Sequence, residues 1–128
     1  MLIHIALGGM LGTVFRYGLQ GWVQDRLARE TFPGGTLAVN VLGSLLLGFL
    51  ARFATGSAVL TPELRAGLTI GFCGAFTTMS TFGYESSTLM ADGQYGRAAV
   101  YIGASVLGCL GGIAAGSSLA GRLLHGGG

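Results

Sequence analysis

The stretch that decides the fold is GFCGAFTTMSTFGYE, residues 71–85. It lies where hydropathy predicts a membrane-spanning helix, yet it contains three glycines and, within positions 77–81, four hydroxyl residues. Glycine and β-branched threonine weaken a helix. A helix that breaks at membrane depth survives only where it is buried in protein or faces a cavity, and its exposed carbonyl and amide groups can then bind ions. The stretch therefore predicts a broken helix, with an ordinary kinked helix, its hydroxyls bonded to its own turn, as the alternative.

The composition is that of an integral membrane protein. Only 9% of the 128 residues are charged, against roughly 25% in a soluble domain. The chain contains 25 glycines and its mean hydropathy is +0.66, as is typical of membrane helices that pack through small residues. We expect one integral membrane domain, residues 1–128. The net charge of +2 comes from arginine alone and forms no basic cluster, so we expect no nucleic-acid partner.

Four stretches are long and apolar enough to cross a bilayer, which takes about 20 residues. They are residues 2–23, 35–53, 64–90 and 98–124. The connections between them are short, with Pro33 and Pro62 at helix boundaries, and none of them can hold a soluble catalytic domain. The sequence therefore predicts an all-α membrane protein with four transmembrane helices per subunit, the third of them broken.

The arginines outside the spans are balanced between the two sides of the membrane. On the N-terminal side lie Arg52, Arg65 and Arg122, and on the other side lie Arg26, Arg29 and Arg97. Because orientation follows an excess of Lys and Arg on one side, this balance favours a dual-topology protein that inserts both ways and pairs antiparallel. A weakly biased protein oriented by something else is the alternative.

Three polar residues at membrane depth need an explanation beyond helix packing. An ionisable group there costs several kcal/mol and normally marks a pathway, a pair or a pore mouth. Arg16 and Glu85 can instead reach an interface with their long side chains. Asn40 lies inside its span and cannot, so it must bond to a buried group or line a wet path.

Three segments together carry a resemblance to a known family. The segments GTLAVNVLGSLLLGF (35–49), GFCGAFTTMSTFGYE (71–85) and GGMLGTVFRY (8–17) resemble the small fluoride channels of the Fluc family. The resemblance implies an antiparallel homodimer in the inner cell membrane, with two narrow pores that export fluoride passively. It also implies a structural sodium ion, not transported, that the broken third helices hold on the dimer axis.

The resemblance also implies roles for individual residues. Backbone carbonyls of Gly74 and Thr77 would bind the sodium ion, and Arg16 would lie near the vestibule. The fluoride path would pass Thr36, Asn40, Met79, Ser80, Thr81, Phe82, Glu85, Tyr101 and Ser105. Met79 departs from the family, which has a phenylalanine there, and Cys109 stands where some members continue a track of hydroxyls.

Two rival functions come from other classes. A small dual-topology multidrug/proton antiporter has a similar size, but we would expect a carboxylate deep in its first span, where this chain has Arg16. An assembly subunit without transport activity explains the glycines but neither Asn40 nor the hydroxyl run. The sequence contains no Ser–Asp or His–Glu constellation, so we expect no enzyme. Cys73 and Cys109 lie in apolar segments, which indicates buried thiols and no disulfide.

Overall fold

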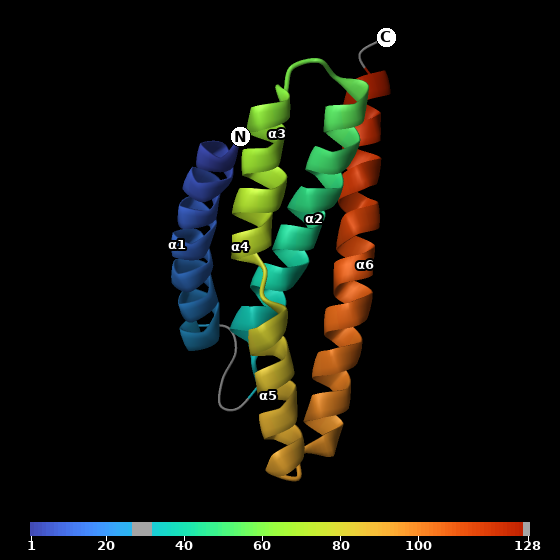
Figure 1. Ribbon diagram of the computed structural model, residues 1–128. Coiled ribbons are helices and arrows are strands. Elements are labelled where there is room, and N and C mark those ends of the chain that lie inside the picture. The colour runs from blue at the N-terminus through green and yellow to red at the C-terminus, as the bar shows by residue number, and fades with distance from the viewer. Residues whose placement is uncertain (27–31, 127–128) are drawn as a thin grey trace.

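The computed structural model describes residues 1–26 and 32–126, and this part of the chain contains helices and no strand. Figure 1 shows the helices as one elongated bundle, with the N- and C-termini toward the same end. The elements are α1 (Leu2–Arg26), α2 (Gly34–Gly56), α3 (Pro62–Ala66), the π-helical segment η1 (Gly67–Cys73), α4 (Gly74–Phe76), α5 (Met79–Ala91) and α6 (Tyr95–His125). The predicted all-α fold is confirmed.

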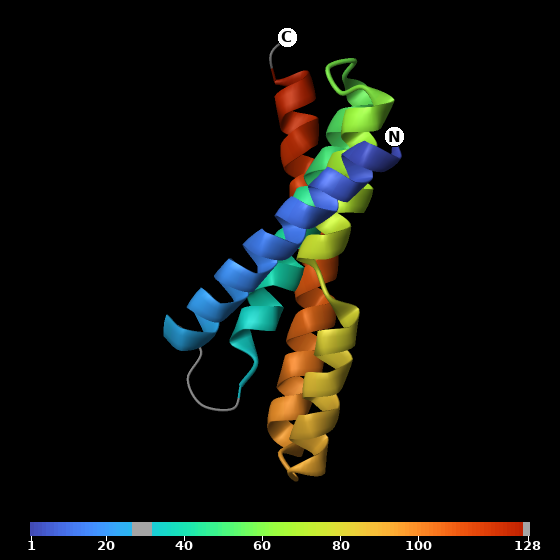
Figure 2. The same ribbon diagram turned by 60° about the vertical axis from the view of Figure 1, so that its left-hand side comes forward.

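Three of the four expected spans are single helices. α1, α2 and α6 are each long and apolar enough to cross a membrane. The third expected span, residues 64–90, consists of α3, η1 and α4, followed by an interruption and α5. Figures 1 and 2 both show α5 continuing the path of α4 toward the opposite end of the bundle.

Local chemistry sets the two ends of this third segment, which runs from the start of α3 at Pro62 to the end of α5 at Ala91. Pro62 occupies the first helical position of α3, and the hydroxyl of Thr61 accepts a hydrogen bond from the amide of Leu64 at 3.2 Å, as an N-cap does. Gly93 adopts a φ of 76° in the turn between α5 and α6, a conformation that glycine adopts without strain.

The π-helical segment was not predicted. π-Helical turns are rare and occur mostly at functional sites, and η1 leads directly into the interrupted part of the third segment. Its glycines pack against α1 backbone to backbone. A Cβ on Gly67 or Gly71 would come within 3.0 Å of a carbonyl oxygen of α1, and a Cβ on Gly8 or Gly12 would do the same toward η1.

A second glycine seam joins α2 and α6. A Cβ on Gly48 would collide with the carbonyl of Ile113, and a Cβ on Gly116 would collide with the carbonyl of Leu45. Small residues at such positions let two helix backbones approach each other in a membrane. The two seams therefore bring α1 to η1 and α6 to α2 at backbone distance.

We predict that Gly12→Ala destabilises the protein. The new methyl group would collide with the backbone of Phe72, and overpacking of this kind typically costs about 1–3 kcal/mol. Thermal unfolding in detergent should show a lower Tm for this variant. Gly18→Ala on the same helix is the matched control, because nothing lies within 4 Å of its Cβ position. Equal melting temperatures for the two variants would contradict the packing account.

Candidate functional site

The third segment is interrupted at Thr77 and Thr78. α4 ends at Phe76, and both threonines adopt extended backbone conformations, with ψ of 158° and 111°. α5 begins at Met79, with the hydroxyl of Thr78 accepting from the amide of Thr81 at 3.4 Å. The broken helix is confirmed, and the interruption lies at Thr77 and Thr78, inside the predicted stretch 71–85. Gly74 itself is helical, because the backbone leaves the helix only where the two threonines follow each other.

The interruption separates several carbonyls from their helical donors. In a continuous helix the amide of Thr78 would donate to the carbonyl of Gly74, and that of Thr81 to the carbonyl of Thr77. Instead the Thr78 amide donates to Oδ1 of Asn40 at 2.7 Å, and the Thr81 amide faces the hydroxyl of Thr78. The carbonyls of Gly74 and Thr77 therefore lose their helical donors, as do those of Ala75 and Phe76, whose donors in a continuous helix would be the amides of Met79 and Ser80.

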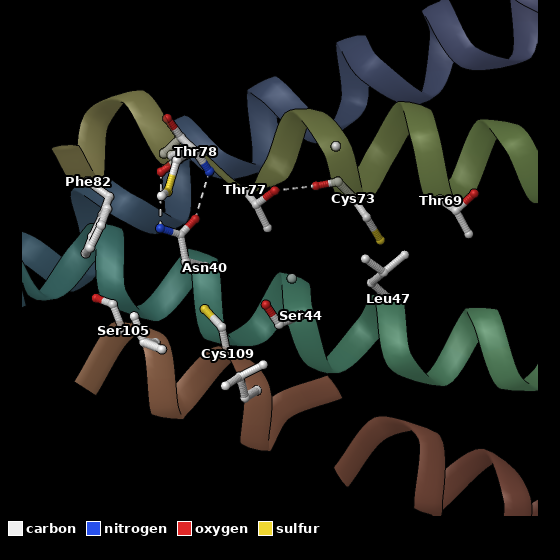
Figure 3. A pocket seen from close by; sticks show the side chains of 15 residues that line it. Asn40, Ser44, Leu47, Thr69, Cys73, Thr77, Thr78, Phe82, Ser105 and Cys109 are labelled. Atoms are coloured by element: carbon white, nitrogen blue, oxygen red, sulfur yellow. Dashed lines mark hydrogen bonds between the residues drawn. The ribbon is translucent and has the colours of Figure 1, made fainter. Parts of the chain in front are cut away.

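Two side chains from neighbouring helices bond to the backbone around the interruption. Asn40 on α2 accepts from the Thr78 amide and donates through Nδ2 to the Thr78 carbonyl at 3.2 Å (Figure 3). Arg16 on α1 donates through Nε to the carbonyl of Ala75 at 2.9 Å. Both residues were predicted to be functional from the sequence. Their hydrogen-bond partner, the backbone of the third segment, was not predicted.

A cavity of about 430 Å³ lies beside the interruption, between α2, the third segment and α6. Six of the predicted site residues line it: Asn40, Gly74, Thr77, Met79, Phe82 and Ser105. The side chains drawn in Figure 3 come from these three parts of the chain and surround a common space. Ser44, Cys73 and Cys109 also line the cavity, although none of them was predicted as a site residue. Cys109, predicted as a buried thiol, is half-buried.

Among the described residues of this lining, the hydroxyl of Ser105 is the one buried side-chain oxygen or nitrogen without a partner. Ser105 is 5% exposed, and among the described residues its Oγ is buried without a hydrogen bond. A buried hydroxyl without a partner costs free energy. The ring of Phe82 also lines the cavity and lies 5.3 Å from the ring of Tyr101, centroid to centroid. Met79 projects from the start of α5 and is 77% exposed.

A second group of predicted residues lies toward the other end of α5. Tyr101 is fully buried, and its hydroxyl donates to Oε1 of Glu85 at 3.1 Å. Thr36 is also buried and accepts from Nε2 of Gln20 at 2.8 Å. Thr36, Glu85 and Gln20 line a separate cavity of about 600 Å³. This polar cavity lies beside α1, toward the end of that helix that carries Asp25.

Four of the predicted residues line neither of these two cavities: Arg16, Ser80, Thr81 and Tyr101. Ser80 is exposed in the first turn of α5, and Thr81 accepts a hydrogen bond from the hydroxyl of Thr78. The structure therefore divides the predicted residues into a group at the interruption and a group around Tyr101, with Phe82 in contact with both.

The chain matches known proteins along most of its length. The model of a family described as "CrcB-like protein, Camphor Resistance (CrcB)" matches residues 3–117. A protein of Geobacter sulfurreducens named "Fluoride-specific ion channel FluC" is 47% identical, over 95% of this chain and 98% of its own. Proteins of the same name from Geobacter metallireducens and Geotalea daltonii are 50% and 48% identical, over 85% of this chain and 87% of theirs.

Proposed function

The chain belongs to the CrcB-like protein family, and we propose that it forms a channel through which fluoride leaves the cell passively. The resemblance based on three segments of the sequence is confirmed by the family match. The predicted localisation is confirmed as well, since the chain is a multi-pass integral membrane protein of the cell membrane. The family is one of ion channels, which is not an enzyme class.

The observation that best supports a path for a small anion is the buried hydroxyl of Ser105. Fluoride is small and strongly hydrated, so a pore must offer donors in place of its water. Ser105 has a hydroxyl without a partner among the described residues, and Asn40 has a second amide hydrogen beyond the one bonded to Thr78. The edge of the Phe82 ring carries the positive part of its quadrupole. Neutral donors hold an anion weakly enough to let it leave.

The two groups of residues suggest an order along the path. Asn40, Met79, Phe82 and Ser105 would form the part of the pore beside the interruption, and Thr36, Glu85 and Tyr101 would form the polar part beyond it, with Ser80 and Thr81 between them. Phe82 supports this continuity because its ring touches that of Tyr101. Arg16 bonds to the backbone beside the interruption, and its predicted place near the vestibule stays a prediction.

A structural sodium ion fits the residues at the interruption. The carbonyls of Gly74 and Thr77 have lost their helical donors, and a bare carbonyl in a dry interior costs several kcal/mol. Two such carbonyls from each of two subunits would supply four neutral oxygens, a donor set that suits a hard cation. A monovalent ion adds the least charge to the membrane interior. When bound, the ion would supply the positive charge that these oxygens need.

An antiparallel homodimer of four-span subunits in a bilayer would account for the apolar side chains on the surface. Large apolar side chains are exposed along α1 and α6, among them Leu7, Val14 and Leu107, as suits contact with lipid or a second subunit. Arg52, Arg65 and Arg122 lie toward the end of the bundle that holds both termini, and Arg26 and Arg97 lie toward the other. Arg29 lies outside the described residues. The interrupted third segment would cross the membrane as one span.

The antiporter remains the alternative function, and the geometry gives it little support. Such a protein needs a carboxylate that exchanges protons deep in its first span. α1 carries Arg16 at that depth, bonded to a backbone carbonyl. The carboxylate of Glu85 lies on α5 and is bonded to Tyr101.

We predict that liposomes containing the purified protein release fluoride down its gradient, with no proton gradient imposed. A fluoride electrode measures the efflux. Asn40→Leu, Asn40→Asp and Phe82→Ile should each lower the rate by about tenfold or more, the effect of about 1.4 kcal/mol on the barrier. Met79→Phe, which restores a ring at the pore, should keep or raise the rate, and Met10→Phe on exposed α1 is its control. Full activity in Asn40→Leu would contradict the proposed path, and a requirement for a proton gradient would favour the antiporter.

We also predict dual topology from the balanced arginines. Reporter fusions to the C-terminus should reveal both orientations in comparable amounts. Two or three lysines added to the N-terminal side should bias the chain to one orientation, because positive loops remain in the cytoplasm. One fixed orientation of the unmodified chain would refute the antiparallel dimer.

A further inference from the structure

Two side chains fix the backbone on either side of the interruption, and they come from different helices. Arg16 on α1 bonds to Ala75 on the α4 side, through Nε at 2.9 Å. Asn40 on α2 bonds to both backbone groups of Thr78, at 2.7 and 3.2 Å, next to the start of α5. Asn40 is 9% exposed and Arg16 is half-buried. Both bonds therefore lie where water competes little for the partners.

These bonds give side-chain donors to two carbonyls near the interruption and draw one amide away from a third. In a continuous helix the carbonyl of Ala75 would accept from the amide of Met79, and here it accepts from Arg16. The Thr78 amide is drawn to Asn40, which takes it away from the carbonyl of Gly74. The oxygens of Gly74, Phe76 and Thr77 thus lack helical donors, while those of Ala75 and Thr78 receive side-chain donors.

We infer that Arg16 and Asn40 are positioning residues for the proposed sodium site, and that Arg16 acts there through its Nε–H and not through its charge. This inference rests on the proposed sodium ion. A positive charge next to the interruption repels a cation, so the charge of Arg16 weakens the binding of sodium there. The favourable contribution of Arg16 is the hydrogen bond that holds the Ala75 carbonyl away from the ion and fixes the end of α4.

Two variants of Arg16 separate the hydrogen bond from the charge. In Arg16→Gln the side-chain amide nitrogen lies as many bonds from Cα as Nε does in arginine, so a neutral donor remains at that place. In Arg16→Met the chain has the same length but no donor. Gln20→Met is the matched control, because Gln20 lies one turn further along α1 and donates to Thr36, away from the interruption.

The experiment measures two properties of the purified full-length protein. The first is the sodium concentration that gives half of the thermal stabilisation, with N-methyl-D-glucamine replacing sodium. The second is backbone hydrogen exchange of residues 74–81, followed by mass spectrometry. We expect Arg16→Met and Asn40→Leu to raise the half-effective sodium concentration about tenfold, the factor for losing one hydrogen bond of this strength. Both should also exchange faster, whereas Arg16→Gln and Gln20→Met should stay within about twofold of the unmodified protein.

Each result decides between the inference and its rivals. The inference is overturned if Arg16→Gln and Arg16→Met give the same half-effective sodium concentration and the same exchange rates. An equal shift in both variants would mean that the charge matters, and no shift in either would mean that Arg16 has no role at the site. If Arg16→Met fails to fold, Asn40→Leu against Gln20→Met makes the comparison, and an unchanged sodium requirement overturns the role of Asn40. If the unmodified protein shows no response to sodium, the proposed ion is wrong. In that case hydrogen exchange still tests whether Arg16 holds the backbone at the interruption. Faster exchange in Arg16→Met than in Arg16→Gln supports this role, and equal exchange refutes it.

Discussion

A polypeptide that leaves its helix inside a membrane must find a partner for every amide and carbonyl that it exposes, since no water is present to bond them. In this protein the constraint acts at Thr77 and Thr78. Asn40 takes the Thr78 amide, Arg16 takes the Ala75 carbonyl, and the Thr78 hydroxyl caps α5. The lining of the adjoining cavity is built around this interruption. The fluoride path and the sodium site that we propose both depend on it.

Glycines at close contacts with the third segment let these side chains reach the interruption. Gly12 packs against the backbone of Phe72, and Arg16 follows one turn later on the same face of α1. Gly43 on α2 leaves room for the side chains of Phe76 and Thr77, just after the turn that carries Asn40. Larger residues at these glycines would push α1 and α2 outward and lengthen the bonds of Arg16 and Asn40. The abundance of glycine is therefore tied to the site as well as to packing.

Much of this arrangement could be predicted from the sequence, because the signals are local. The length of the apolar stretches predicted the helices, and the threonines that follow Gly74 predicted the break in the third one. The exact place of the interruption and the π-helical segment η1 were not predictable, since both depend on the contact with α1 and α2. Asn40 and Arg16 were identified because polar groups are costly at membrane depth. Their backbone partners, 38 and 59 residues away in the chain, were not, and the roles of the individual pore residues remain predictions.

We propose that the carbonyls of Gly74 and Thr77, released by the interruption, meet a cation between two antiparallel subunits. A high-resolution structure of the purified protein in lipid and sodium tests it most directly. The account predicts compact density on the two-fold axis, about 2.3–2.6 Å from these oxygens, as around a hard cation of that size. An axis where protein donors satisfy the two carbonyls, or a third helix continuous through Thr77 and Thr78, would contradict it.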